Sequence, residues 1–366
     1  MVDSNGFSAE DILEFSQDKF ERKRRKFNQK PTYITWEITN DCNLHCKHCA
    51  LAEAGKPLKD ELNTKEAFEV IENIADSGAK EILISGGEPL VRGDILEITN
   101  HASRFLSVSL QTNGYLLEEY AHELKGIGLE QIQISLDGLN ARSHDFLRGK
   151  GSFEKAIRGI KKCQELDFKL VSVAAVIHQS NLKELPDMID MMLEMKVDFF
   201  EVRALAPFGK AQNLAKLALT IEQRKKLYEY VAKKQQEFRI IGSEDPYIYM
   251  LNREMLDECL DISNQTACLG CAAGIVGCTI KPNGKIVPCS GVKVEVGDIR
   301  TEKLIDIWKN SHIFQLLRDR NNLKGKCGIC EYKYICGGCR GAATELSGGD
   351  VMAEDPMCWF EPTLES

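Results

Sequence analysis

Three cysteines near the start of the chain have the types and spacing needed for iron chemistry. Cys42, Cys46 and Cys49 form a Cys-x3-Cys-x2-Cys pattern directly after an apolar run at 33–38. Three thiolates from one short loop can hold three irons of a cubane and leave the fourth iron without a protein ligand. An open iron lets a cluster bind a small molecule and pass it an electron. A structural zinc site needs four ligands, and here the fourth would have to be one of the loop's two histidines.

A second motif follows about forty residues later, at the end of another apolar run. It reads Gly86-Gly87-Glu88-Pro89. Two glycines let backbone carbonyls approach a ligand closely, Pro89 fixes the turn, and Glu88 offers a carboxylate to a cationic ammonium group. Alone, the motif also fits an ordinary strand-to-helix turn. Together with the cysteine loop, it predicts a ligand pocket.

Composition excludes several classes of protein. The chain has 366 residues, 28% of them charged, and a net charge of -8, which argues against a general nucleic-acid binder. No apolar run is long enough to span a membrane, and no signal peptide is present. The 14 cysteines therefore favour metal or cluster ligation in a reducing cytoplasm over disulfides.

The elements that must position these motifs alternate along the chain. Short apolar runs predict strands, and longer amphipathic stretches between them predict helices. Six such units imply a parallel sheet closed into a partial (β/α)6 barrel, with the site at the carboxyl ends of the strands. The predicted strands are 33–38, 81–85, 107–111, 131–135, 170–177 and 199–203, and the predicted helices are 64–77, 94–104, 116–126, 152–166, 181–195 and 220–236.

The chain divides into three predicted regions. Residues 1–30 form a helical lead-in, 31–260 the barrel, and 261–366 a cysteine-rich domain that contains a β-hairpin around Gly284. Polar residues follow several barrel strands and predict a polar rim, although Asn-Gly and Asp-Gly are also common turn formers. Arg203, at the end of the sixth strand, is a candidate for a substrate carboxylate or a simple partner of Glu201.

The cysteine loop and the Gly-Gly-Glu-Pro turn together resemble the radical S-adenosylmethionine (SAM) superfamily. The resemblance implies that Cys42, Cys46 and Cys49 hold a [4Fe–4S] cluster whose open iron chelates the methionine part of SAM. It also implies that Gly86-Gly87-Glu88-Pro89 lines the methionine amino group. Asn113 and Ser135 would lie near the ribose of SAM, with Arg148 a candidate for its carboxylate.

The cysteine-rich tail resembles the SPASM extension, which holds auxiliary iron–sulfur clusters. The resemblance implies an outer set of ligands and an inner set, one or two further clusters in all; paired zinc sites are the alternative. Cys336 and Cys339 enclose two residues where the usual pattern has three. Cys268 is the alternative to Cys278 as a ligand of the inner set. The outer set would be Cys327, Cys330, Cys336 and Cys358, and the inner set Cys271, Cys278, Cys289 and Cys339.

These resemblances imply a radical enzyme that takes hydrogen from an unactivated C–H bond. The segments at 323–327 and 353–358 are similar to enzymes that trim tetrapyrrole side chains, most closely the SAM-dependent heme synthases of the siroheme-derived pathway. The best hypothesis is oxidative decarboxylation of two propionates of iron-coproporphyrin III to vinyls. Alternatives are a SPASM peptide or protein maturase, a related tetrapyrrole-trimming enzyme, and a non-enzymatic electron carrier. A low-potential donor such as ferredoxin or flavodoxin is the expected partner.

Overall fold

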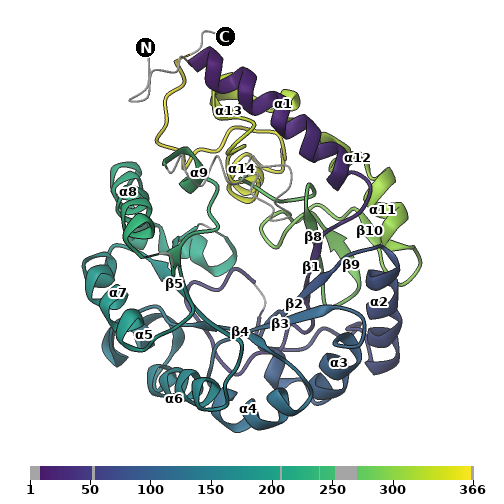
Figure 1. The fold of residues 1–366 in the computed structure, drawn as a ribbon, viewed down its shortest axis with the longest axis vertical. Helices are drawn as coiled ribbons and strands as arrows, with labels where there is room; N and C mark the ends of the chain where they lie inside the picture. The colour runs from purple at the N-terminus through teal and green to yellow at the C-terminus, as the bar shows by residue number, and fades with distance from the viewer. Residues whose placement is uncertain (1–8, 52–53, 207, 239, 252–269, 364–366) are drawn as a thin grey trace.

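Six parallel strands, each followed by helical structure, form the ring seen in Figure 1. The computed structural model describes residues 9–51, 54–206, 208–238, 240–251 and 270–363. The strands are β1 (Tyr33–Glu37), β2 (Glu81–Ser85), β3 (Ser107–Thr112), β4 (Gln131–Ser135), β5 (Leu170–Ile177) and β6 (Phe199–Ala204). The outer helices are α2 (Thr64–Asp76), α3 (Ile95–Ala102), α4 (Leu117–Gly126), α6 (Ser152–Glu165), α7 (Leu185–Glu194) and α8 (Ile221–Glu237). The predicted partial (β/α)6 barrel is confirmed.

The sheet extends beyond these six strands on both sides. Its order is β10-β9-β8-β1-β2-β3-β4-β5-β6-β7. The added strands are β7 (Ile241–Gly242), β8 (Gly277–Ile280), β9 (Lys285–Val287) and β10 (Gly297–Asp298). β8 pairs with β1 in parallel, with Tyr33 opposite Gly277. The predicted hairpin, β8 and β9, therefore continues the barrel sheet, although its two strands lie more than two hundred residues after β1 in the sequence.

Alternation along the strands separates an apolar outer face from a more polar inner one. In β4, Ile132 and Ile134 are buried in the main hydrophobic core, whereas Gln131, Gln133 and Ser135 between them are only partly buried. Successive side chains of a strand point to opposite faces of the sheet, so the glutamines face the space that the barrel encloses. The inner face therefore presents polar side chains to a ligand bound inside the barrel.

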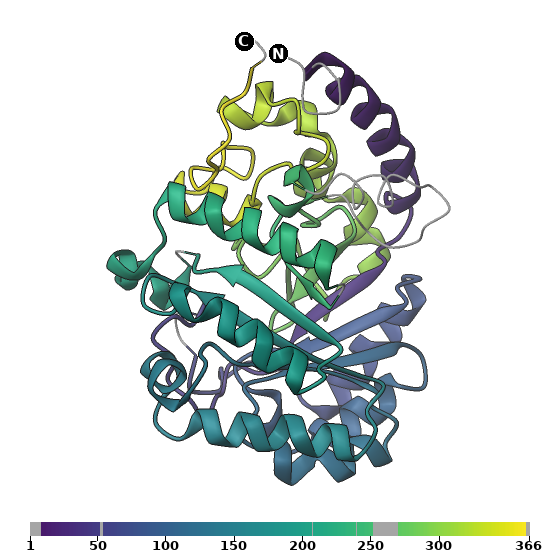
Figure 2. The same cartoon turned by 60° about the vertical axis from the view of Figure 1, so that its left-hand side comes forward.

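The N-terminal helix α1 (Ala9–Phe27) lies against the cysteine-rich tail, and both are at the top of the molecule in Figure 2. Phe20, 0% exposed, packs with Ile275, Val276 and Tyr334 of the tail. The lead-in therefore stabilises the tail by covering an apolar face of it. Among the described residues, no helix is long and apolar enough to cross a membrane.

Candidate functional site

The structure brings the three cysteines of the first motif together at the carboxyl end of β1. Cys42, Cys46 and Cys49 are all partly buried. Burial, with smaller contributions from the Glu88 carboxylate and the Cys46 and Cys49 thiolates, raises the pKa of Cys42 to about 11. Thiols that raise one another's pKa lie close together, and a bound metal deprotonates such thiols outright. The loop therefore presents three sulfur donors to one region, as iron binding requires.

The Gly-Gly-Glu-Pro turn fixes the start of this loop through backbone contacts. The N–H of Gly87 donates to the carbonyl of Thr39 at 2.8 Å, and the N–H of Glu88 donates to that of Asp41 at 2.8 Å. A Cβ at Gly87 would lie 2.0 Å from the Asp41 carbonyl oxygen, and Gly86 has a φ of +134°. Both glycines are thus required by close approach or by backbone conformation.

Glu88 braces the turn from inside. Its carboxylate is fully buried and accepts hydrogen bonds from the Thr112 hydroxyl at 2.7 Å and the Asn113 N–H at 2.7 Å. Burial raises the pKa of Glu88 to about 6, although these hydrogen bonds oppose the rise. Glu88 therefore ties the turn to the end of β3, in addition to any contact with an ammonium group.

Asn113 lies directly beside the cysteine loop. Its Nδ2 donates to Asn43 Oδ1 at 2.8 Å and contacts Cys42 Sγ at 3.9 Å. Ser135 ends the neighbouring strand β4, where it is partly buried and in register with Ala174 of β5. Both residues thus follow adjacent strands on the cysteine side of the barrel, as the sequence predicts.

A buried ion pair anchors the other side of the loop. Arg148 Nε donates to Asp137 Oδ2 at 2.5 Å, and His48 Nε2 lies 3.2 Å from the same oxygen. Burial alone would raise the pKa of Asp137, but the charge of Arg148 and its hydrogen bond lower it far below the usual range. The Arg148 carbonyl also lies 4.0 Å from Cys46 Sγ. Arg148 therefore joins the loop to β4, and its guanidinium is engaged by Asp137.

The four outer cysteines of the tail face one pocket, which Lys326 and Tyr332 also line. Burial, with smaller contributions from other cysteines of the set, raises the pKa of Cys330 to about 12 and that of Cys358 to about 11. The donors that line the pocket are Cys327, Cys330, Cys336 and Cys358. Four thiols around one pocket form a donor set that fits an iron–sulfur cluster.

Three of the four inner cysteines also lie together. Cys271 raises the pKa of both Cys289 and Cys339, after the larger effect of burial. Cys278 is placed elsewhere: it lies in β8, 3% exposed, within the main hydrophobic core. Burial raises its pKa to about 12, opposed only by Arg318. The structure gives no support for Cys278 as the fourth inner ligand, because pairing of β8 with β1 turns its side chain into the core.

The competing residue Cys268 lies outside the described residues. Within the described part of the chain, no three His, Cys, Asp or Glu side chains converge closely enough to hold a single metal ion.

A chain of polar side chains crosses the inside of the barrel. Ser85 donates to Gln111 at 2.8 Å, Gln111 to Gln133 at 2.6 Å, and Gln133 to Glu201 at 2.9 Å. Arg203 continues the chain. Gln133 was not singled out from the sequence, although the alternation Gln131-Ile132-Gln133-Ile134 is a signal that places it on the inner face.

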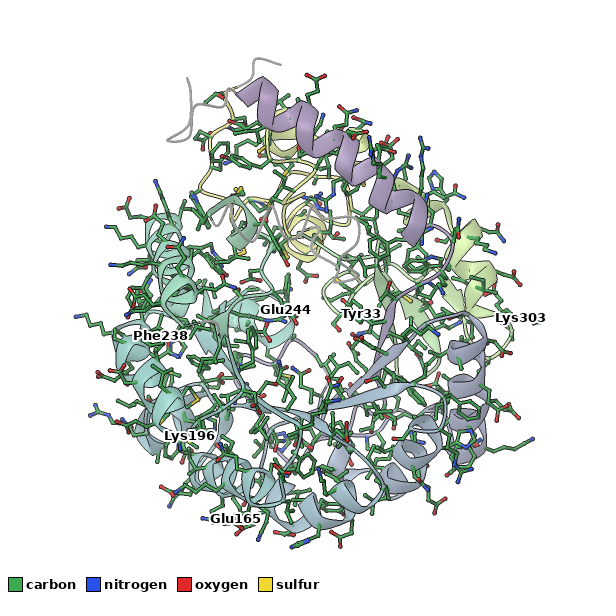
Figure 3. The ribbon with its side chains drawn as sticks, in the orientation of Figure 1. Tyr33, Glu165, Lys196, Phe238, Glu244 and Lys303 are labelled. Carbon is green, nitrogen blue, oxygen red and sulfur yellow. The ribbon has the colours of Figure 1, made fainter. Side chains whose placement is uncertain are left out.

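Arg203 is paired with two carboxylates, Glu201 and Glu244. The Arg203 side chain remains 43% exposed and that of Glu244 68% exposed. Figure 3 shows Glu244 and Tyr33 at the inner side of the ring. Burial, the Glu244 carboxylate and the Cys289 thiolate raise the pKa of Tyr33. The sequence did not single out Glu244 or Tyr33, because nothing local marks either residue as close to the inner cysteines.

Comparison with known proteins agrees with this geometry. Residues 36–192 match the family model of the radical SAM superfamily, and residues 271–331 match SPASM, an iron–sulfur cluster-binding domain. The chain is 34% identical to the AdoMet-dependent heme synthase of Methanosarcina barkeri, over 91% of this chain and 97% of that one. It is 30% identical to the mycofactocin maturase MftC of Mycolicibacterium smegmatis, over 92% of this chain and 85% of that one.

The fold is shared with a solved structure as well. SuiB of Streptococcus suis, crystallised with S-adenosylmethionine, matches with a TM-score of 0.71 at 20% identity, over 94% of this chain and 81% of that one. The matched families define the cofactors as a [4Fe–4S] cluster, SAM and auxiliary iron–sulfur clusters. With a relative matched over nearly its whole length, the chain belongs to the radical SAM superfamily and is an enzyme of its SPASM-containing branch.

Proposed function

We propose that this enzyme oxidatively decarboxylates two propionate side chains of iron-coproporphyrin III to vinyl groups. The observation that carries the proposal is the 34% identity to a heme synthase over 91% of this chain. Each conversion removes one hydrogen atom, one CO2 and one electron from a propionate. The product is a vinyl group, so the overall change is an oxidation and the electron needs an acceptor.

Separate groups of residues would hold the cluster and bind SAM. Cys42, Cys46 and Cys49 would hold the [4Fe–4S] cluster, which when bound would supply the electron for reductive cleavage of SAM to methionine and a 5′-deoxyadenosyl radical. Gly86, Gly87, Glu88 and Pro89 would border the methionine amino group. Asn113 and Ser135 would lie near the ribose. Arg148 would hold the loop through Asp137 and present its remaining N–H groups to the SAM carboxylate.

The substrate would bind inside the barrel, with Arg203 meeting a propionate. A guanidinium matches a carboxylate in a planar, bidentate geometry. Glu244, a largely exposed carboxylate already bonded to Arg203, occupies the place that a propionate would take. Tyr33 lies near both Glu244 and the inner cysteines, which supports a substrate position between the radical source and an electron acceptor.

The auxiliary clusters would accept the electron released with CO2. The outer set of four cysteines and the inner Cys271, Cys289 and Cys339 provide the donors. Cytoplasmic location and reduction by a ferredoxin or flavodoxin belong to the same proposal, since all these cofactors need a reducing environment.

A second candidate is modification of a peptide, which the likeness to MftC favours. One experiment separates the two. The anaerobically reconstituted enzyme is incubated with SAM, reductant and iron-coproporphyrin III, and the porphyrin is followed by mass spectrometry. Loss of two carboxyl groups supports the proposal. Cleavage of SAM with an unchanged porphyrin overturns it and favours a peptide substrate.

A further inference from the structure

A buried junction lies between the outer and the inner cysteine sets. Asp355 is 0% exposed, and its backbone N–H donates to Cys327 Sγ at 3.4 Å. Its carboxylate accepts the backbone N–H of Cys339 at 2.7 Å and the hydroxyl of Tyr247 at 2.5 Å. A single aspartate therefore contacts one cysteine of each set.

Arg340 completes the junction on the outer side. Its Nη2 lies 3.6 Å from Cys327 Sγ, and its Nη1 donates to the carbonyls of Val351 at 3.2 Å and Ala353 at 2.7 Å. The side chain is buried, at 3% exposure. Within the described part of the chain, no carboxylate forms an ion pair with it, so its charge is directed at the thiolate of Cys327.

Tight packing fixes this geometry. Gly338 has a φ of +64°, and a Cβ there would lie 2.6 Å from Arg340 Nη2 and 3.0 Å from Cys327 Sγ. A glycine is needed both for the backbone conformation and for the space. The contact between the guanidinium and the thiolate is therefore built into the backbone.

We propose that this junction orders the two auxiliary clusters, so that the outer cluster accepts an electron more readily than the inner one. The proposal rests on the ligand sets of the proposed function. A cation and N–H donors at Cys327 stabilise the extra negative charge of a reduced outer cluster, which raises its potential. The carboxylate of Asp355 accepts the Cys339 N–H and bears most closely on the inner set, so it disfavours reduction of the inner cluster more than that of the outer one, although it also raises the pKa of Cys327 and Cys358.

The resulting transfer involves no bond and no proton. One electron leaves the reduced inner cluster and reduces the outer cluster, which then reduces a one-electron carrier protein. Arg320 is another buried cation in this region, and it lies near Cys271 of the inner set as well as Cys336 of the outer set. It therefore favours reduction of both clusters and does not set their order.

The test is an anaerobic redox titration followed by electron paramagnetic resonance. The background protein carries Cys42→Ala, Cys46→Ala and Cys49→Ala, so that only auxiliary clusters contribute. We expect Arg340→Met to lower the reduced-to-oxidised ratio of the outer cluster about tenfold at fixed potential, or about 59 mV for one electron. Arg340→Lys, which keeps the charge, should recover part of this shift.

Two further variants complete the design. Asp355→Asn should raise the potential of the inner cluster more than that of the outer one, opposite in sign to the effect of Arg340→Met on the outer cluster. Lys324→Met is the matched control, because Lys324 carries the same charge in the same domain but pairs with Asp350 at the surface. It should leave both potentials unchanged.

Iron content shows whether a failed prediction contradicts the junction or the proposed ligand sets. Full auxiliary iron with unmoved potentials in Arg340→Met and Asp355→Asn overturns the junction and leaves the proposed ligand sets standing. The proposal is also overturned if the background protein, with Arg340 and Asp355 intact, has full auxiliary iron and the inner cluster has the higher potential. Absence of auxiliary iron from the background protein would refute the ligand sets themselves.

Discussion

Replacing Gly87 with alanine tests whether the Gly-Gly-Glu-Pro turn needs a residue without a side chain at this position. The new Cβ would lie 2.0 Å from the carbonyl oxygen of Asp41, whereas ordinary contact begins at 3.4 Å. The turn or the loop must therefore move by about 1.4 Å. Such a shift strains the two backbone hydrogen bonds from Gly87 and Glu88 to the cysteine loop.

The magnitude follows from these contacts. Each backbone hydrogen bond contributes about 1 kcal/mol, and forcing an extra methyl group into a packed site costs about 1–3 kcal/mol. We expect Gly87→Ala to lower the free energy of unfolding by about 3 kcal/mol. SAM binding should also weaken at least tenfold, because the displaced backbone borders the proposed methionine site.

Gly93→Ala is the matched control. A Cβ at Gly93 would meet nothing within 4 Å. This variant should unfold within about 0.5 kcal/mol of the parent and bind SAM normally. Urea unfolding and anaerobic equilibrium dialysis with labelled SAM measure the two quantities. Equal stability and equal SAM affinity of the two variants would refute the reasoning.

Three other predictions concern buried charge, the inner cysteines and the substrate. Asp137→Asn removes the charged partner of Arg148 and should lower the free energy of unfolding by about 3 kcal/mol at pH 7. Because the pKa of Asp137 is lower in the folded than in the unfolded protein, this stabilisation is present above about pH 4 and is lost as the pH falls. The urea midpoints of the variant and the parent should therefore converge in acid. Cys278→Ala should keep the full iron content and lose only some stability, whereas Cys289→Ala should lose auxiliary iron; equal iron loss in both would contradict the placement of Cys278. Arg203→Met should raise the KM for iron-coproporphyrin III about tenfold with SAM binding unchanged, and an unchanged KM would exclude Arg203 from the substrate site.

Local patterns in the sequence predicted most of the barrel. The six strands and their helices carry apolar periodicity that a single segment reveals, and the cysteine loop and the Gly-Gly-Glu-Pro turn are contiguous motifs. The pairing of β8 with β1 could not be read in this way, because it joins residues far apart in the chain. The same non-local pairing places Cys278 in the core, whereas the resemblance to the SPASM extension had implied that it is a ligand.

The contacts that support the site could not be predicted from the sequence either. Asp137 stood at a predicted strand end, but its ion pair with Arg148 depends on how the helical segment Ala141–Arg148 returns to the rim. Asp355 and Arg340 bear no motif of their own. Their contacts with Cys327 and Cys339 arise only when the tail folds on itself, and the proposed tuning of cluster potentials depends on those contacts.

In the proposed reaction, a SAM-derived radical removes hydrogen from a propionate of iron-coproporphyrin III. The most direct measurement uses substrate deuterated at the propionate carbon next to the ring and follows the label by mass spectrometry. We expect deuterium in 5′-deoxyadenosine, with one 5′-deoxyadenosine formed for each vinyl group. Unlabelled 5′-deoxyadenosine, together with a porphyrin that keeps its carboxyl groups and its deuterium, would contradict the proposed reaction.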